Sequence, residues 1–332
     1  MNRFLVTGGA GFIGSHLVER CISENVETVI LDDLSTGSME NIKAHLHDKR
    51  VKFVEGSILD ESLIRSLIQN TDAVIHLAAA VGVRLVIDRP IHTIETNIHG
   101  TSNILAAAKS CNCPVLIASS SEVYGISEQI PFKEDDFVML GPTRKSRWSY
   151  ACTKALDEWM ALAYATEHGL PVVICRLFNT VGPRQTGRYG MVLPTFISQA
   201  LSGKPITVFG DGNQTRCFLH VKDTVDAIFR IMHEPAALGL VFNIGSQEEI
   251  TINQLARMVT DISGIHADID HIPYEKAYGE GFEDLRRRVP DISKLQRIIG
   301  FKPQFNTREI VKDILNYQHE LVESAKLTFQ TR

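Results

Sequence analysis

The sequence predicts an α/β protein built on a doubly wound parallel sheet, and three observations support this prediction. Short apolar runs alternate with helical patterns through the first half of the chain. A glycine-rich segment lies between the first apolar run and the first helical pattern. After residue 180 the alternation gives way to short segments broken by glycine and proline, which favours a smaller C-terminal substrate-binding domain.

The elements of the predicted sheet follow in chain order. Strands are predicted at 4–6, 28–31, 51–54, 73–76, 114–118 and 171–178. Helical patterns fall between them at 13–21, 61–69, 90–110 and 149–165. A helix at 222–232 and a strand at 240–243 return to the sheet, and later helices begin near 251, 291 and 307. The predicted dinucleotide-binding domain is 1–180 with 218–246 returning to it, and the predicted substrate domain is 181–217 with 247–325.

Composition excludes several classes of function. The chain has 332 residues, of which 44% are hydrophobic and 22% charged, as in ordinary globular proteins. A net charge of −5 offers no basic field for nucleic acid. No apolar stretch is long enough for a membrane span, and no signal peptide is apparent. Six scattered cysteines favour reduced thiols in a cytoplasmic protein, and no metal site is predicted.

The glycine-rich segment has the spacing of a dinucleotide-binding loop. Gly8, Gly11 and Gly14 follow an apolar strand and open a helix. Glycines there allow a tight turn and a close approach of the backbone to a pyrophosphate. The second strand ends in Asp32 and Asp33, which suit ribose hydroxyls and repel a 2′-phosphate. The predicted cofactor is therefore NAD, and the prediction makes the sheet Rossmann-like.

Further cofactor contacts are predicted where later strands end. Ser57 and Ile58 follow the third strand, near the expected adenine, and Leu77, Ala78 and Ala79 follow the fourth. Small residues at these places are equally compatible with plain tight packing. The predicted set is completed by Phe12, Ile13, Asn97 and Ser119, together with Tyr150 and Lys154.

A serine cluster and a helical pair supply the predicted chemistry. Ser120 and Glu122 follow a buried strand, and Tyr150 and Lys154 lie four residues apart on a predicted helix. That spacing places the two side chains on one face, where an ammonium group would favour the phenolate and so lower the pKa of the phenol. Tyr150 is then a candidate general base, and Ser120 could share a substrate hydroxyl proton. The alternative is a solvated helix face.

Together these residues resemble a known family, the extended short-chain dehydrogenase/reductases of the NAD-dependent epimerase/dehydratase group, which modify nucleotide sugars. The resemblance covers nearly the whole chain and rests on 8–14, 76–79, 119–125, 150–154, 176–179 and 210–216. It implies a tightly held NAD that takes hydride from the sugar, usually at C4, and returns it. It also implies that Ser120 contacts the 4-hydroxyl and Lys154 the nicotinamide ribose, and that Asn179 and Arg216 bind the nucleotide diphosphate.

The resemblance also bears on the reaction. Decarboxylases and 4,6-dehydratases of the family carry a glutamate at the position of Glu122, whereas simple 4-epimerases usually lack it. Ser121 stands where dTDP-glucose dehydratases have an aspartate, which counts against their reaction. Arg288 resembles an arginine that approaches the substrate in UDP-glucuronate decarboxylases; the alternative is that 286–288 form a solvated turn. Arg184 and Arg188 are further candidates for binding a sugar carboxylate, which a uronate 4-epimerase would also need.

The best interpretation is a UDP-glucuronate decarboxylase in which Tyr150, Lys154, Ser120 and Glu122 are catalytic. The alternatives are a UDP-hexose or UDP-hexuronate 4-epimerase, a 4,6-dehydratase, and a scaffold that binds NAD without turnover. The resemblance implies a homodimer formed by the helices at 94–108 and 149–165. The partner that the resemblance implies is a nucleotide-sugar substrate, with a UDP-sugar as the expected one.

Overall fold

The computed structural model describes residues 1–187, 191–274, 276 and 285–330, and for residues 83, 84 and 324–330 it gives only the secondary structure. Its centre is a sheet of seven parallel strands in the order β11-β6-β5-β4-β1-β2-β3. The order reverses between β1 and β4, and in such sheets ligands bind outside the carboxyl ends of the strands at that point. The predicted Rossmann-like fold class is confirmed.

The strands are buried from both sides, which explains their nearly continuous apolar sequences. In chain order they are β1 Arg3–Thr7, β2 Glu27–Asp32, β3 Val51–Glu55, β4 Ala73–His76, β5 Val115–Ser120, β6 Val172–Leu177 and β11 Val241–Ile244. A short helix, η3 Ser121–Tyr124, begins directly after β5. Polar residues therefore gather at the carboxyl ends of β4, β5 and β6, where the apolar runs stop.

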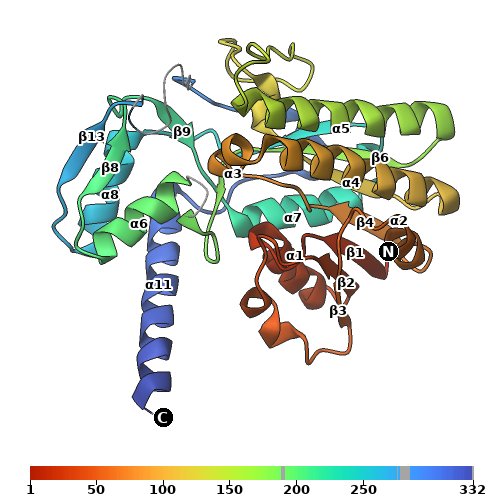
Figure 1. Ribbon diagram of the computed structural model, residues 1–332, viewed down its shortest axis with the longest axis horizontal. Coiled ribbons are helices and arrows are strands. Elements are labelled where there is room, and N and C mark those ends of the chain that lie inside the picture. Colours follow the sequence, from red (N-terminus) through yellow and green to blue (C-terminus); the bar gives the residue numbers. More distant parts are fainter. Residues whose placement is uncertain (188–190, 275, 277–284, 331–332) are drawn as a thin grey trace.

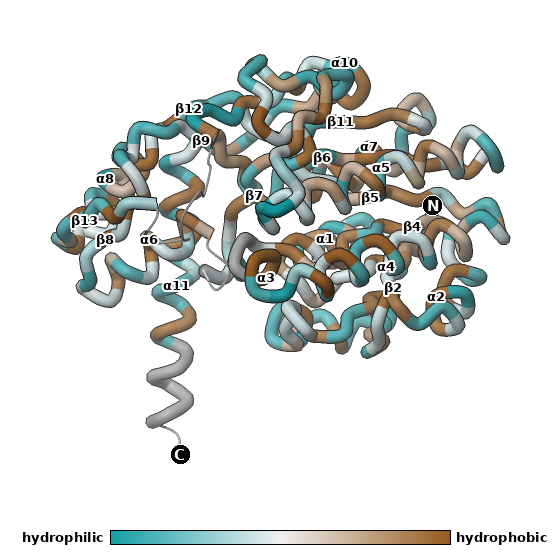
Figure 2. The backbone as a smooth tube through the Cα atoms, turned by 45° about the horizontal axis from the view of Figure 1, so that its top comes forward, coloured by the Kyte–Doolittle hydropathy of each residue, from teal (hydrophilic) through white to brown (hydrophobic). Residues whose placement is uncertain are grey.

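Helices cover both faces of the sheet (Figure 1). One face packs against α1 Phe12–Ser23, α7 Val221–Met232 and α10 Ser293–Ile299. The other packs against α2 Glu61–Ile68, α4 Pro90–Cys111 and α5 Arg147–His168, with α3 Val83–Asp88 beside α4 and α5. The hydropathy colouring in Figure 2 places brown, hydrophobic strands between these layers. Short helices η1 Met39–Asn41, η2 Lys43–His45 and η5 Pro235–Ala237 connect elements.

A second lobe has its own apolar core, formed mainly by α6, α8 and α11. Its helices are α6 Val192–Leu201, α8 Ile252–Ser263 and α11 Thr307–Gln330. Its strand pairs are β8 Ile206–Phe209 with β13 Ile269–Ile272, and β9 Thr215–Cys217 with β12 Glu249–Thr251. A third pair, β7 Thr180–Val181 with β10 Leu219–His220, lies where the chain passes between the lobes.

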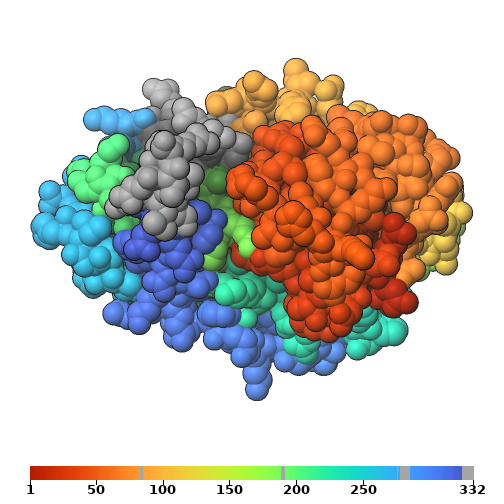
Figure 3. Space-filling view, turned by 90° about the horizontal axis from the view of Figure 1, so that it is seen from below, coloured from red at the N-terminus to blue at the C-terminus, as the bar shows by residue number. Residues whose placement is uncertain are grey.

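In Figure 3 the red and orange N-terminal residues lie on one side of the molecule and the blue C-terminal residues on the other. We keep the predicted domain boundaries as a proposal. The end of α11 extends beyond the rest of the molecule (Figure 1). Among the helices in the described ranges, none combines the length and the apolar character that crossing a membrane requires.

Candidate active site

The glycine-rich loop brings backbone segments too close together for side chains. A Cβ atom on Gly14 would lie 2.2 Å from the carbonyl oxygen of Gly8, and Gly8 itself has φ +70°. Gly11 precedes α1 and offers no side-chain cap, so the first amide groups of the helix remain available to an anion. These features fit the pyrophosphate of a dinucleotide. Phe12 and Ile13, which the sequence predicts as cofactor contacts, are the first two residues of α1.

Asp32 shapes the loop at the adenosine end of the predicted site. Its carboxylate accepts hydrogen bonds from the amides of Ala10 at 2.9 Å and Leu34 at 2.8 Å. Burial raises the pKa of this carboxyl above its ordinary value, although the backbone hydrogen bonds oppose that effect. Asp33 is exposed and accepts from the amide of Ser35. Contact of either acid with a ribose stays a prediction.

The segments after β3 and β4 are held by specific contacts. Ile58 is buried against Gly100, and the Ser57 hydroxyl accepts from the amide of Leu59. The backbone of Leu77 and Ala78 lies against Gly8, where a Cβ would be 2.8 Å from the Ala78 nitrogen.

Asn97 has a structural role that the sequence did not reveal. Its side chain bonds the backbone of Ala80 and donates to the Thr153 hydroxyl at 3.1 Å. It thereby ties the segment containing Ala79 to α5. A direct contact of Asn97 with the cofactor remains a prediction.

The structure brings Ser120 and Tyr150 together. Ser120 ends β5 and its side chain accepts from the amide of Glu122, which begins the turn of η3. The Tyr150 phenol, from the first turns of α5, lies close enough to the Ser120 hydroxyl for that hydroxyl to lower the pKa of the phenol, against the larger effect of burial. A serine hydroxyl and a phenol placed side by side can act together on one substrate hydroxyl.

The expected effect of Lys154 on Tyr150 is wrong for the chain without cofactor. Burial raises the pKa of the Tyr150 phenol well above its ordinary value, and the negative charge of Glu122 adds to this. The Lys154 ammonium lies 3.1 Å from the carboxylate of Asp157, so its charge is locally neutralised. A nearby cation must carry its charge toward the phenol to favour ionisation, and here a carboxylate opposes it.

Glu122 is held by arginines from two parts of the chain. Arg288, 8% exposed in its side chain, donates to one carboxylate oxygen, and Arg147 lies 3.5 Å from the other. Burial disfavours the charged carboxylate, but the guanidinium groups outweigh it and the pKa of Glu122 is below its ordinary value. The alternative that residues 286–288 are simply solvated therefore fits Arg286 and Arg287, whose side chains are more than half exposed. It does not fit Arg288.

Asn179 and Arg216 lie at the entrance to the second lobe. The Asn179 side-chain amide donates to the carbonyl of Cys217 at 3.0 Å. Arg216, buried on β9, donates to the carbonyls of Thr215 and Leu285, and its charge contributes to the low pKa of Glu122. The structure thus brings Arg216 near the Glu122 cluster, while diphosphate binding by either residue stays a prediction.

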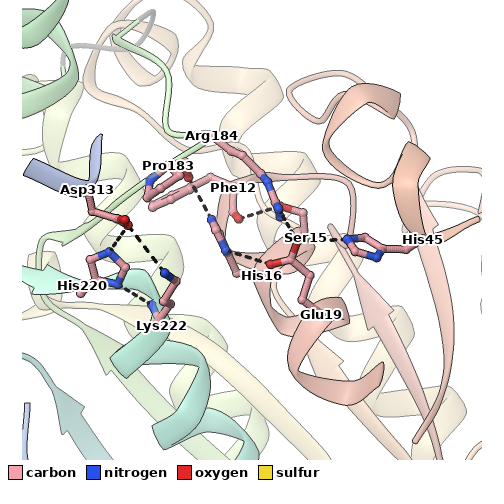
Figure 4. Close-up of polar contacts among 10 residues, drawn as sticks. All are labelled: Phe12, Ser15, His16, Glu19, His45, Pro183, Arg184, His220, Lys222 and Asp313. Carbon is pink, nitrogen blue, oxygen red and sulfur yellow. Dashed lines mark hydrogen bonds and ion pairs between the residues drawn. The ribbon is translucent and has the colours of Figure 1, made fainter. Parts of the chain in front are cut away.

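Arg184 follows β7, and its side chain contacts α1, the helix after the glycine-rich loop (Figure 4). Its guanidinium donates to Ser15 at 3.2 Å and to Glu19, both on α1. Burial of Glu19 opposes ionisation, but hydrogen bonds from His16 and Arg184 lower the pKa of the carboxyl to about 2. His45 bonds the same carboxylate at 3.0 Å. Substrate binding by Arg184 stays a prediction, and Arg188 lies outside the described residues.

A buried ionic network below the site was missed by the sequence reasoning. Glu158 accepts hydrogen bonds from Ser119 and from two nitrogens of Arg176, at 2.9 and 2.7 Å for the latter. The available signal was Arg176 itself, a charged residue within an apolar strand, because such a residue requires a buried partner. The network fixes the end of β5 against α5, and so positions Ser120 relative to Tyr150.

The fold and this constellation define a class: an NAD-dependent enzyme of the short-chain dehydrogenase/reductase type. The chain belongs to the NAD dependent epimerase/dehydratase family, whose sequence model matches residues 4–245. Its cofactor is accordingly NAD, and the glycine loop has the shape that this cofactor needs. When bound, NAD supplies the acceptor and donor of hydride.

Individual relatives cover almost the whole chain. The UDP-N-acetyl-alpha-D-glucosaminuronate decarboxylase of Bacillus cytotoxicus is 41% identical over 323 residues, covering 96% of this chain and 98% of the relative. UDP-glucuronic acid decarboxylase 3 of Arabidopsis thaliana is 36% identical, over 92% and 86% respectively. The structure of UDP-glucuronic acid 4-epimerase from Bacillus cereus, in complex with UDP-glucuronic acid and NAD, has a TM-score of 0.87 at 29% identity, covering 96% and 99%.

His76 leads to a testable prediction about stability. It ends β4, is buried, and bonds the hydroxyls of Thr7 at 2.8 Å and Thr101 at 3.2 Å. Burial, with a contribution from Lys154, lowers the pKa of His76 from 6.5 to about 3. The unfolded chain therefore binds a proton that the folded chain excludes, so the stability due to His76 is complete above pH 6.5 and is lost as the pH falls toward 3.

We expect His76→Gln to flatten the decline of stability in this window. The wild type should lose about 2 kcal/mol more than the variant between about pH 6.5 and about pH 5. Denaturant unfolding at a series of pH values measures the difference. Parallel pH dependences for the two proteins would contradict the assignment.

Proposed function

We propose that the chain is a UDP-hexuronate decarboxylase, with UDP-glucuronate as the first substrate to test. The observation that carries this proposal is the ion pair of Glu122 and Arg288 close to Ser120 and Tyr150. A neutral hexose needs no guanidinium at its C6 end, whereas a uronate presents a carboxylate there. Arginine binds carboxylates with paired, directional hydrogen bonds.

The first steps concern the 4-hydroxyl of the sugar. Ser120 holds this hydroxyl by a hydrogen bond, and Tyr150, in its phenolate form, accepts the hydroxyl proton while the C4 hydrogen leaves as the hydride that NAD would accept. Lys154 lies one helical turn from Tyr150, paired with Asp157, and its expected role is to contact the nicotinamide ribose when NAD is bound. The product of these steps is a ketone at C4, which makes the C6 carboxylate part of a β-keto acid.

The carboxylate can then leave. The C5–C6 bond breaks, carbon dioxide departs, and the electron pair forms an enolate over C5, C4 and O4. Tyr150, now protonated, is placed to hydrogen-bond that enolate oxygen. A proton from solvent adds to C5, and Glu122, ionised and a quarter exposed, orients the water that supplies it. Return of hydride to C4 and of the proton from Tyr150 to O4 completes a pentose without net redox.

The comparisons support this reaction and define its rival. Two relatives with high coverage are named as decarboxylases of UDP-hexuronates, one of them carrying an N-acetyl group on the sugar. The structural neighbour from Bacillus cereus is named as a 4-epimerase of UDP-glucuronic acid. Both reactions begin with oxidation at C4, and both need a carboxylate-binding site. They differ in whether carbon dioxide is released.

The direct test uses the purified full chain with NAD. We expect carbon dioxide and a UDP-pentose from UDP-glucuronate, or carbon dioxide and the N-acetylated pentose from UDP-N-acetylglucosaminuronate, identified by NMR. UDP-glucose serves as the neutral control. Tyr150→Phe should lower turnover by about 100-fold or more, because it removes the proton acceptor. A UDP-galacturonate product without gas would replace the proposal by 4-epimerisation, and a Tyr150→Phe variant with full turnover would remove Tyr150 as the base.

Arg288 offers a sharper variant with a matched control in the next residue. Removing one partner of a buried charge pair typically costs 2–5 kcal/mol, so Arg288→Gln should lower kcat/KM for the uronate by about 30-fold or more. Arg287→Gln should have little effect, because Arg287 is 54% exposed and pairs with Glu249. Steady-state kinetics with both variants compare the two positions. Equal losses at 287 and 288 would contradict carboxylate binding by Arg288.

We further propose that the protein is a cytoplasmic homodimer formed by α4 and α5. Ile91 and Trp159 are 71% and 60% exposed on these helices, and Ile94 is 38% exposed. Exposed apolar residues grouped on two adjacent helices favour an interface with a second copy. All six cysteines are free, which suits a reducing compartment.

Trp159→Glu should shift the dimer to monomer, because it places a charge in the centre of the proposed interface. Sedimentation velocity gives the oligomeric state of the variant. Phe137→Glu is the control, since Phe137 is 85% exposed but lies in a loop outside α4 and α5. Dimerisation that survives Trp159→Glu and is lost with Phe137→Glu would place the interface elsewhere.

A further inference from the structure

Two guanidinium groups contact Glu122, one at each oxygen of its carboxylate. Arg288 donates to Oε1, and a terminal nitrogen of Arg147 lies 3.5 Å from Oε2. Arg288 comes from the segment before α10, whereas Arg147 is the first residue of α5. The carboxylate is therefore held from two separate parts of the fold. The proposed reaction requires Arg288 and gives Arg147 no role.

Arg147 occupies a position that is unfavourable for a cation. The amino end of a helix carries partial positive charge, and α5 has no acidic residue in its first turn to offset it. The side chain is only 13% exposed, so the guanidinium also loses much of its hydration. The Cζ atom of Arg147 lies 4.8 Å from the centroid of the Trp148 ring, and Trp148 is buried. The contact with Glu122 helps to offset the cost of placing a cation there.

A substrate carboxylate would compete with Glu122 for Arg288. In the proposed reaction Arg288 binds a uronate, yet its guanidinium already donates to Glu122. Two carboxylates that share one cation repel each other, and the pKa of one of them rises until it takes up a proton. A protonated Glu122 would lose the charge with which it orients water toward C5. The site therefore needs a second cation at Glu122 while a uronate is bound.

Three further groups lie around Glu122, on three different elements. Arg216 of β9 contributes less to the low pKa of Glu122 than the other two arginines do, and its guanidinium donates to two backbone carbonyls. The Tyr150 phenol of α5 is neutral, because burial and the charge of Glu122 raise its pKa. Tyr124 of η3 is buried, which raises its pKa to about 12, and it donates to a side chain of β11. None of these groups replaces the contact that α5 makes with Glu122.

We propose that Arg147 is a positioning residue that retains Glu122 when a substrate carboxylate binds Arg288, so that the site holds both carboxylates at once. This inference rests on the proposed function. Arg147 acts on the substrate through Glu122, and it does so from the helix that carries Tyr150 one turn further on. A neutral hexose brings no second carboxylate. The effect of Arg147 should therefore appear with a uronate and be absent with a hexose.

The test measures ligand binding in the NAD-loaded Tyr150→Phe protein, which should consume the ligand slowly. Isothermal titration calorimetry gives Kd for UDP-glucuronate and for UDP-glucose, which carry the same diphosphate. When Arg147→Gln is added, Glu122 should take up a proton as the uronate binds, so Kd for UDP-glucuronate should rise about tenfold between about pH 5.5 and about pH 7.5. With Arg147 present, Kd should change by less than about twofold over the same range, because both carboxylates stay ionised. Kd for UDP-glucose should not depend on pH in either protein.

Three variants in the same Tyr150→Phe protein serve as controls. Arg147→Lys keeps a cation and should restore the flat pH dependence. Arg144→Gln removes an exposed cation three residues earlier and should leave Kd and its pH dependence unchanged. Glu122→Gln combined with Arg147→Gln removes the competing carboxylate, so Kd for UDP-glucuronate should again be independent of pH. If Arg147→Gln does not fold, Arg147→Met is the second neutral variant for the same measurements.

The outcomes separate this inference from the proposed function. A flat pH dependence for UDP-glucuronate with Arg147→Gln overturns the inference, and so does a pH dependence that persists when Glu122→Gln is added. An equal loss of affinity for both ligands at every pH reduces Arg147 to a structural residue and also overturns it. If the pH dependence follows the expectation but the native protein releases no carbon dioxide from any UDP-hexuronate, the proposed reaction fails and the role of Arg147 stands.

Discussion

The site depends on the compensation of charges that the fold removes from water. Glu122 belongs to the sheet half of the chain, and Arg288 reaches it from a segment 166 positions later. Breaking a buried pair by removing one partner leaves an uncompensated charge, which costs far more than the pair itself contributes. The same rule governs Lys154 with Asp157, and Arg176 with Glu158. These pairs fix where the reacting groups can lie, and the apolar layers around them supply the stability.

Much of the fold follows from local pattern. The strands of the sheet are short apolar runs, and their order follows from a chain that alternates strand and helix. The function of the glycine loop can be predicted from the glycine spacing. The reason is local: the backbone at Gly8 and Gly14 is too close together for side chains. Ser120, Tyr150 and Lys154 could be predicted as candidates for the same reason, since helix periodicity and the end of a strand are visible in sequence.

What the sequence could not predict is how side chains choose partners once the elements are packed. In the sequence Asn97 is a polar residue within a helix, but in the structure its side-chain amide is hydrogen-bonded to Ala80 and Thr153. The influence of Lys154 on Tyr150 was predicted from spacing alone and was wrong, because Asp157 one turn further on neutralises the ammonium. Arg184 was predicted as a substrate contact from its charge, and its contact with Glu19 of α1 could not be predicted in the same way. In each case the deciding partner is set by burial and by competition, which a pattern of residue types does not contain.

The contacts of Glu19 shown in Figure 4 have a consequence for how the two lobes can move. The Glu19 carboxylate on α1 interacts with three side chains: His16 of the same helix, His45 of η2, and Arg184, which follows β7. Separating these segments would leave the Glu19 carboxylate, whose pKa is lowered to about 2, without the groups that stabilise its charge. We expect any relative motion of the two lobes to use the contacts of Glu19 as its hinge. The largest displacements would then occur on the side of the molecule farthest from α1.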